Sequence, residues 1–109
     1  MKPQAAVLTG DLIGSTEAPP EAVEAAMARI AAIADRMSSI ASFARHRGDG
    51  WQLYLENPGL GLATMILIAA DLRAARGLES RIALGLGGAY INNIKTMFAV
   101  RDLYAANGS

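Results

Sequence analysis

Two aspartates, Asp11 and Asp49, lie next to glycines at places where the chain is expected to turn. Asp11 follows a short apolar run, and Asp49 lies between Gly48 and Gly50. Two carboxylates about 4 Å apart repel each other by about 4 kcal/mol at an effective dielectric constant of about 20. A divalent cation between them removes this repulsion, and their hard oxygen atoms suit Mg²⁺ or Mn²⁺. The two residues are therefore candidate metal ligands, provided that the fold brings them together.

The loop after Asp11 has the composition of a phosphate-binding loop. Residues 12–16 are small or aliphatic, and a predicted helix begins shortly after them. Backbone N–H groups in such a loop can bind the phosphates that the same metal ions bridge. An alternative stays open, because aspartate is common in turns and Asp-Gly is frequent at the tip of a β-hairpin. On that alternative, Asp11 and Asp49 form turns and nothing more.

The hydrophobic pattern predicts the elements that would position these residues. One helix begins near residues 19–20, and alternating residues 51–55 together with extended residues 43–47 predict a β-hairpin. The apolar stripe of that helix consists of Val23, Met27, Ile30, Ala34, Met37 and Ala41. Further strands are predicted at 5–9 and 79–86, and a second helix at 60–76. The order β-α-β-β-α-β predicts an α+β, ferredoxin-like fold, with an antiparallel sheet and both helices on one face.

Two contacts follow from this arrangement as expectations. Residues 60–76 are apolar nearly all round, so we expect the second helix to be covered on two sides. Arg45 and Arg47 lie on the hairpin with Glu56, and we expect them to pair with that carboxylate across the hairpin.

Composition excludes several classes of function. Ten basic and ten acidic side chains give a net charge of zero, which argues against a nucleic-acid-binding surface. The absence of cysteine excludes disulfides, thiolate metal sites and cysteine nucleophiles. The longest uncharged run, residues 57–70, is shorter than the ~20 residues of a membrane span. We therefore expect a cytoplasmic protein with neither a nucleic acid nor a membrane as partner.

Three motifs resemble the catalytic domain of class III adenylate/guanylate cyclases. Residues 10–16, Gly-Asp-Leu-Ile-Gly-Ser-Thr, resemble the first motif of that family, in which an aspartate ends the first strand. Residues 48–54 resemble its hairpin, Gly-Asp-Gly followed by an aromatic strand, and residues 81–87 resemble a later strand. The order and spacing agree over about residues 5–89. The short, glycine-rich form is also similar to the bacterial SatD-type proteins.

The resemblance implies a site for a nucleoside triphosphate and two Mg²⁺ (or Mn²⁺) ions. Asp11 and Asp49 would be the metal ligands, and Arg45 would lie where adenylate cyclases place a base-reading lysine. The other implied positions are Ile13, whose backbone carbonyl would help to hold the second metal, and Gly14, Ser15 and Thr16 near the triphosphate. The implied activity is cyclisation of the triphosphate to a 3′,5′-cyclic nucleotide in signalling, and the implied assembly is a homodimer.

The sequence departs from the cyclase pattern at positions that matter for catalysis. Ser15 replaces the usual aromatic residue of the first motif. Cyclases also use an Asn and an Arg to stabilise the transferring phosphoryl group, and Asn92, Asn93, Lys95 and Arg101 do not fall in a matching pattern. Three hypotheses remain: an active cyclase, a non-catalytic nucleotide-sensing or protein-interaction module on the same fold, and a ferredoxin-like interaction domain without a ligand. We expect residues 1–109 to form a single cyclase-like domain that is incomplete at its C-terminus.

Overall fold

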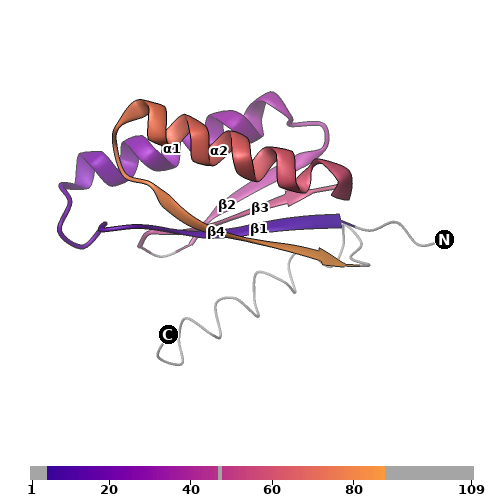
Figure 1. The fold of residues 1–109 in the computed structure, drawn as a ribbon, viewed down its shortest axis with the longest axis horizontal. Coiled ribbons are helices and arrows are strands. Elements are labelled where there is room, and N and C mark those ends of the chain that lie inside the picture. Colours follow the sequence, from indigo (N-terminus) through magenta and orange to yellow (C-terminus); the bar gives the residue numbers. More distant parts are fainter. Residues whose placement is uncertain (1–4, 47, 88–109) are drawn as a thin grey trace.

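The computed structural model describes residues 5–46 and 48–87, which fold into one sheet with two helices on one of its faces (Figure 1). The elements along the chain are β1 (Ala5–Leu12), α1 (Pro20–Arg36), β2 (Ala41–Arg45), β3 (Gly50–Leu55), a 3₁₀ turn (Pro58–Leu60), α2 (Gly61–Ala75) and β4 (Ser80–Gly87). The four strands are antiparallel in the order β2-β3-β1-β4. This arrangement confirms the predicted α+β, ferredoxin-like β-α-β-β-α-β fold.

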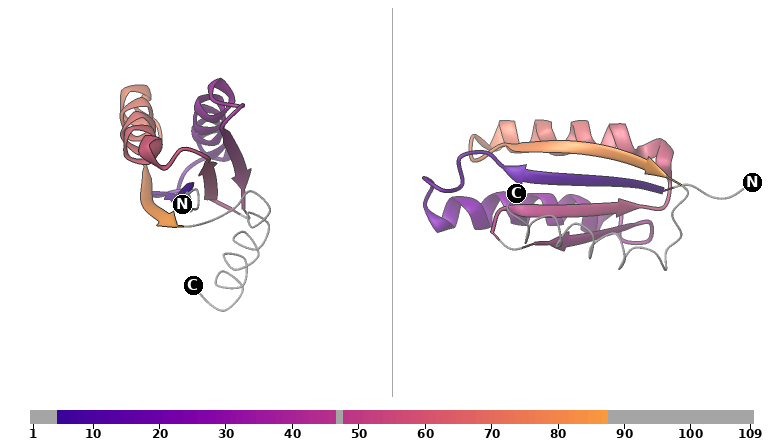
Figure 2. Two further views of the ribbon diagram at one scale, coloured as in Figure 1. Left: turned by 90° about the vertical axis from the view of Figure 1, so that its right-hand side faces the viewer. Right: turned by 90° about the horizontal axis from the view of Figure 1, so that it is seen from below.

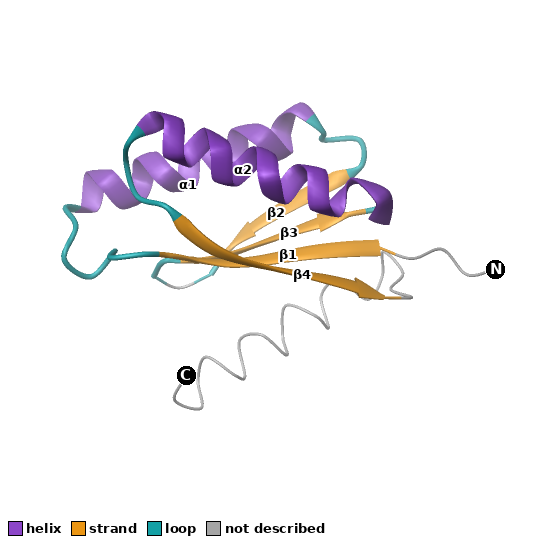
Figure 3. Cartoon of the chain, viewed as in Figure 1, coloured by secondary structure: helices purple, strands orange, loops and turns teal. Residues whose placement is uncertain are grey.

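The two helices divide the sheet between them. Figure 2 shows α1 over β2 and β3, and α2 over β4 and β1. In Figure 3, no helix of the described residues 5–46 and 48–87 lies on the opposite face of the sheet. The strand termini that carry the candidate site residues thus lie at one edge of this layer, next to the start of α1.

The core lies between the sheet and the two helices. Alternate strand residues such as Leu8, Leu53 and Leu55 are fully buried there, because successive side chains of a strand point to opposite faces. Ile30 of α1 and Ile68 of α2 pack against them and are also fully buried. Each such side chain contributes about 1.5–3 kcal/mol of hydrophobic stabilisation.

The end of α1 differs from the sequence prediction. The apolar stripe predicted a helix that extends to Ala41, but α1 ends at Arg36 and Ala41 is already the first residue of β2. Met37 and Ala41 both pack against the core, so the hydrophobic spacing continues although the backbone has changed. Ser38 and Ser39, which are weak helix formers, lie in the turn between the two elements.

The two sides of α2 differ in how far the described residues cover them. Thr64, Ile68 and Leu72 are buried against the sheet, but Leu62 and Ile66 are 56% and 58% exposed. The described residues thus cover one side of this helix, and cover on its second side stays a prediction. By length and composition alone, Pro58–Ala75 is long and apolar enough to cross a membrane, which for a single helix is weak evidence of a membrane span. Its buried residues, Gly61, Thr64, Ile68 and Leu72, lie along one face.

Two parts of the sequence analysis lie outside the described residues. One is the predicted pairing of Arg47 with Glu56. The other is the set of candidates for stabilising a transferring phosphoryl group, Asn92, Asn93, Lys95 and Arg101.

Candidate functional site

The end of β1 lies directly beside the tip of the β2–β3 hairpin. Asp11 is the register partner of Gly50, and the backbone N–H of Leu12 donates a hydrogen bond to the carbonyl of Asp49 over 3.1 Å. The antiparallel sheet thus brings the backbones of the two aspartates, 38 positions apart in the sequence, to the same edge.

The two aspartates differ in the face of the sheet toward which they point. Leu8, Gly10 and Leu12 are buried on the helix side of β1, so Asp11 falls on the opposite face by strand alternation. Asp49 lies in the hairpin turn and borders a pocket on the helix side. The structure therefore brings their backbones together but does not place both carboxylates in that pocket.

Asp11 is held in place by a small network from the neighbouring strands. The indole N–H of Trp51 donates to the hydroxyl oxygen of Ser80 over 3.0 Å, and this hydroxyl lies 3.0 Å from the carbonyl oxygen of Asp11. Gly10 makes room for the fully buried indole, since a Cβ at that position would overlap the ring. Residues from β1, β3 and β4 together fix the backbone at this end of the sheet.

The loop after β1 leads from this edge to α1. Gly14 has a φ of +73°, a conformation that favours glycine, and lets the chain turn back toward the hairpin. The hydroxyl of Ser15 donates a 2.5 Å hydrogen bond to the Asp49 carboxylate, which ties the loop to the hairpin tip. Ile13 is 45% exposed, and its backbone N–H donates a hydrogen bond to the carbonyl of Glu79. The metal-binding role expected of its own carbonyl stays a prediction.

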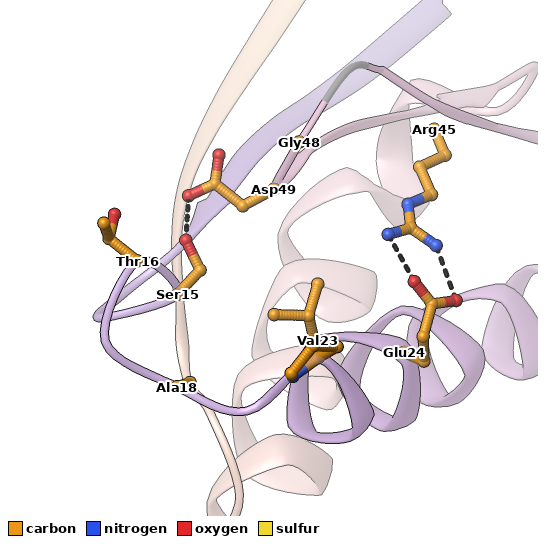
Figure 4. Close-up of a pocket in the computed structure, with 9 residues that line it drawn as sticks. Ser15, Thr16, Ala18, Val23, Glu24, Arg45, Gly48 and Asp49 are labelled. Atoms are coloured by element: carbon orange, nitrogen blue, oxygen red, sulfur yellow. Dashed lines mark hydrogen bonds and ion pairs between the residues drawn. The ribbon is translucent and has the colours of Figure 1, made fainter.

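A cavity of about 420 Å³ lies between this loop, the hairpin tip and the start of α1 (Figure 4). Its volume falls within the range of small-molecule sites in proteins. The lining residues are Ser15, Thr16, Ala18, Pro20, Val23, Glu24, Arg45, Gly48 and Asp49. Of the residues singled out in the sequence, Ser15, Thr16, Arg45 and Asp49 therefore border the cavity, whereas Asp11, Ile13 and Gly14 are not among its lining.

At the other end of the cavity, Arg45 of β2 forms a bidentate ion pair with Glu24 of α1. The two guanidinium nitrogens lie 2.8 and 2.7 Å from the two carboxylate oxygens. These hydrogen bonds hold the pKa of Glu24 below its ordinary value and raise the pKa of Arg45. The predicted pairing of Arg45 with Glu56 is wrong, because Arg45 is the register partner of Trp51 and Glu56 lies beyond the opposite end of the hairpin.

Sequence reasoning did not find Glu24 as a site residue. Its polar position, off the apolar stripe of α1, is equally typical of a solvated helix face. The signal that could have found it is its place in the second turn of a helix that directly follows the Asp11 loop. In the predicted topology, that turn packs beside the end of the hairpin strand that carries Arg45.

The donor atoms suit a hard cation, but they are few. The Asp49 carboxylate faces the cavity, and neither ion pair found among residues 5–46 and 48–87 involves it. No group of three or more His, Asp or Glu side chains in the same residues could hold a metal ion. Of the two carboxylates that line the cavity, Glu24 is paired with Arg45, which leaves Asp49 as the one outside an ion pair. An ion bound there would complete its coordination shell with ligand and water oxygens.

Comparison with known proteins identifies a fold rather than an activity. No family model matches the sequence, and no curated protein matches it. Among solved structures, a bacterial light-regulated adenylyl cyclase has a TM-score of 0.53 at 18% identity, covering 80% of this chain and 55% of the cyclase chain. A variant of SnoaB, a cofactor-independent oxygenase from Streptomyces nogalater, has a TM-score of 0.48 at 15% identity, covering 82% of this chain and 97% of the other. The chain thus spans about half of the cyclase structure, and the described residues share the ferredoxin-like fold of that adenylyl cyclase.

Proposed function

We propose that this domain binds a nucleoside triphosphate together with Mg²⁺ or Mn²⁺ in the cavity between the Asp11 loop, the hairpin tip and α1. The observation that carries the proposal is the distribution of charge in that cavity. A carboxylate faces one end of it, and a guanidinium–carboxylate pair lies at the other. The cyclase-like fold supports the same assignment.

The residues at the Asp49 end would hold the metal and the phosphates. Asp49 is the proposed metal ligand, and the hydroxyl of Ser15, which now donates to it, would turn away when a cation takes its place. Asp11 is the proposed second ligand, although its side chain falls on the opposite face of the sheet, so it would have to reach the ion around the end of β1. Thr16 lies on the cavity wall, where its polar groups can reach a phosphate oxygen. A bound cation supplies positive charge that offsets the triphosphate and polarises its phosphorus atoms.

If the domain is active, the proposed reaction is intramolecular cyclisation of the nucleotide. The ribose 3′ oxygen bonds to the α-phosphorus, the bond from that phosphorus to the β-bridging oxygen breaks, pyrophosphate leaves, and the hydroxyl proton passes to water. By the same resemblance we propose a cytoplasmic signalling role and a homodimer in which a second copy faces the site.

One observation favours the non-catalytic alternative, a nucleotide-sensing module on the same fold. Among the described residues that line the cavity, Arg45 is the one cationic side chain, and Glu24 already neutralises it. Phosphoryl transfer depends on positive charge around the equatorial oxygens of the transferring group. The described residues supply binding groups in this cavity without a further cation for that charge.

The test is a thermal shift assay with GTP or ATP, each with and without Mn²⁺. We expect the triphosphate and metal together to raise the melting temperature. Binding to the folded state adds RT ln(1 + [L]/Kd) to the free energy of unfolding. Asp49→Asn should abolish the metal-dependent part, whereas the matched control Asp35→Asn, on the exposed face of α1, should not. No shift with either nucleotide in the unmodified protein would reject nucleotide binding, and a full shift in Asp49→Asn would reject the metal assignment. Chromatography of the products for a cyclic nucleotide separates the active form from the sensing module.

A further inference from the structure

Strand β3 is buried on both of its faces. All six of its residues are buried, whereas buried and half-buried residues alternate along most of β1. Leu53 and Leu55 belong to the core under the helices, so Gln52 and Tyr54 point to the opposite face of the sheet by strand alternation. An antiparallel strand with one solvated face alternates between buried and exposed residues. The uninterrupted burial of β3 therefore means that its face opposite the helices is covered as well.

No helix of the described residues supplies this cover. Tyr54 is 4% exposed and Gln52 5%, yet neither α1 nor α2 lies on that face of the sheet (Figure 3). Ala5 of β1 points to the same face and is also buried. Ala5 and Tyr54 are outside the cluster of buried residues that forms the core between the sheet and the helices. That core thus does not account for the burial of these three side chains.

The buried strip on this face is narrow. Ser42 of β2, the register partner of Tyr54, is exposed, and so are Ala83 and Gly85 of β4 on the same face. Neighbouring strands are about 4.8 Å apart and a helix with its side chains is about 10 Å wide, so one helix covers about two strands. A second copy packed sheet against sheet would bury this face across all four strands. The width of the strip therefore favours a single segment of chain.

The polar groups of the strip have partners within the sheet. The side-chain amide of Gln52 donates a hydrogen bond to the hydroxyl of Thr9 over 3.3 Å, and its oxygen lies 3.2 Å from Nε2 of His46. A buried amide that is hydrogen-bonded in this way does not require a polar group above it. Beside it lie the methyl group of Ala5 and the ring of Tyr54. We therefore expect the segment that covers the strip to be apolar on the side that faces β3.

Residues 88–109 have a suitable position, length and composition. They follow Gly87, the end of β4 and the register partner of Ala5, so they leave the sheet where the buried strip begins. A strand of 8 residues spans about 27 Å, which a helix of about 18 residues matches. Their apolar side chains recur at the spacing of one helix face, namely Tyr90, Ile91, Ile94, Met97 and Phe98.

We propose that residues 88–109 fold back over the sheet face opposite α1 and α2, and that their apolar stripe packs against Ala5, Gln52 and Tyr54. The domain then has three layers, with the sheet between the two helices and this segment. The cavity lined by Ser15 and Asp49 is on the helix side, so the packing leaves it open. The inference is therefore independent of the proposed function.

Photo-crosslinking in the full chain identifies the segment that covers β3. The crosslinking amino acid p-benzoylphenylalanine takes the place of Tyr54 and, as a control, of Ile66 on the exposed side of α2. After irradiation, we expect a product of monomer mass in which position 54 is joined to a peptide from residues 88–109, and no such product from position 66. A product of dimer mass would identify a second copy and overturn the proposal. Absence of a crosslink from position 54, or a crosslink only to residues 5–87, would overturn it too.

Hydroxyl-radical oxidation of Tyr54, followed by mass spectrometry, gives a second measurement. Ile94→Asp places a charge on the apolar stripe, and the matched control Thr96→Asp places the same charge off it. We expect Ile94→Asp to raise the oxidation rate of Tyr54 about tenfold, since loss of one buried aliphatic contact shifts the equilibrium of opening by about that factor. Thr96→Asp should leave the rate unchanged.

Trp51 serves as the internal control for folding, because it is fully buried on the helix side of β3. It should stay protected in both variants. Equal oxidation rates of Tyr54 in the two variants, with Trp51 protected, would contradict the packing of the stripe. If Trp51 is oxidised faster in Ile94→Asp, that variant has unfolded, and the crosslink at position 54 decides.

Discussion

The close contact between Gly10 and Trp51 gives a sharp test of how the sheet supports the candidate site. A methyl group at position 10 would overlap the indole of Trp51, which is fully buried and has no flexible end that could move aside. Overpacking of a core costs about 1–3 kcal/mol. The shift would also strain the hydrogen bond from Trp51 to Ser80, which is worth about 1 kcal/mol. We therefore expect Gly10→Ala to lower the free energy of unfolding by about 3 kcal/mol.

Gly85→Ala is the matched control, since it makes the same change in the adjoining strand β4. A Cβ there would lie 3.9 Å from the carbonyl oxygen of Val7, an ordinary contact. Replacing glycine at a compatible position stabilises by about 0.4–1 kcal/mol. Urea unfolding followed by the fluorescence of Trp51, the one tryptophan of the sequence, measures both variants. At about 4–8 °C per kcal/mol, Gly10→Ala should also melt about 12–24 °C lower. If the two variants unfold within about 1 kcal/mol of each other, the packing argument for Gly10 fails.

Three further predictions concern the site and the helices. Ser15→Ala removes the hydroxyl that donates a hydrogen bond to the Asp49 carboxylate, so titration with Mn²⁺ should show a few-fold tighter binding. Weaker binding would contradict the proposal that a cation replaces this hydroxyl at Asp49. The pKa of Glu24 is held below its ordinary value of 4.5, so its contribution to stability is present above that pH and is lost as the pH falls further through the lowered pKa. The urea midpoint of Glu24→Gln should therefore depend less on pH below about 4.5, and an unchanged profile would show that the ion pair does not form. Ile66→Ala should change the free energy of unfolding by less than about 0.5 kcal/mol, whereas Ile68→Ala should cost about 2–5 kcal/mol, because the two side chains are 58% and 0% exposed. Similar losses in the two variants would mean that the outer side of α2 is covered.

The fold could be predicted from the sequence because its periodicities are local and strong. Alternation in residues 51–55 and the helical spacing from Val23 onward each identify an element without knowledge of the rest. The limits of this approach appear at Met37 and Ala41, where residues of a turn and a strand continue the spacing of the helix. Hydrophobic spacing reports which residues reach the core, and it does not report whether the backbone between them is still helical.

The candidate site was only partly predictable for a related reason. The adjacency of Asp11 and Gly50 follows from the strand order, which the topology predicts. The direction of each side chain depends on register and on the shape of the turn, and a shift of one residue moves a side chain to the other face. The partner of Arg45 depends on how α1 packs over β2, a tertiary contact between residues 21 positions apart that no local pattern encodes.

The proposed ligand groups of the cavity share one feature that bears on how binding would proceed. Asp49 accepts a hydrogen bond from Ser15, and Arg45 is paired with Glu24, so both already have a partner from the segment that follows β1. Each polar contact with a ligand would replace an existing contact, which lowers the net gain in free energy. Under the proposed function, selectivity then depends on the difference in free energy between the contacts with the ligand and the contacts within the protein that they replace. Ser15 and Glu24, which supply the existing partners, would accordingly affect the affinity for a ligand together with the groups that contact it.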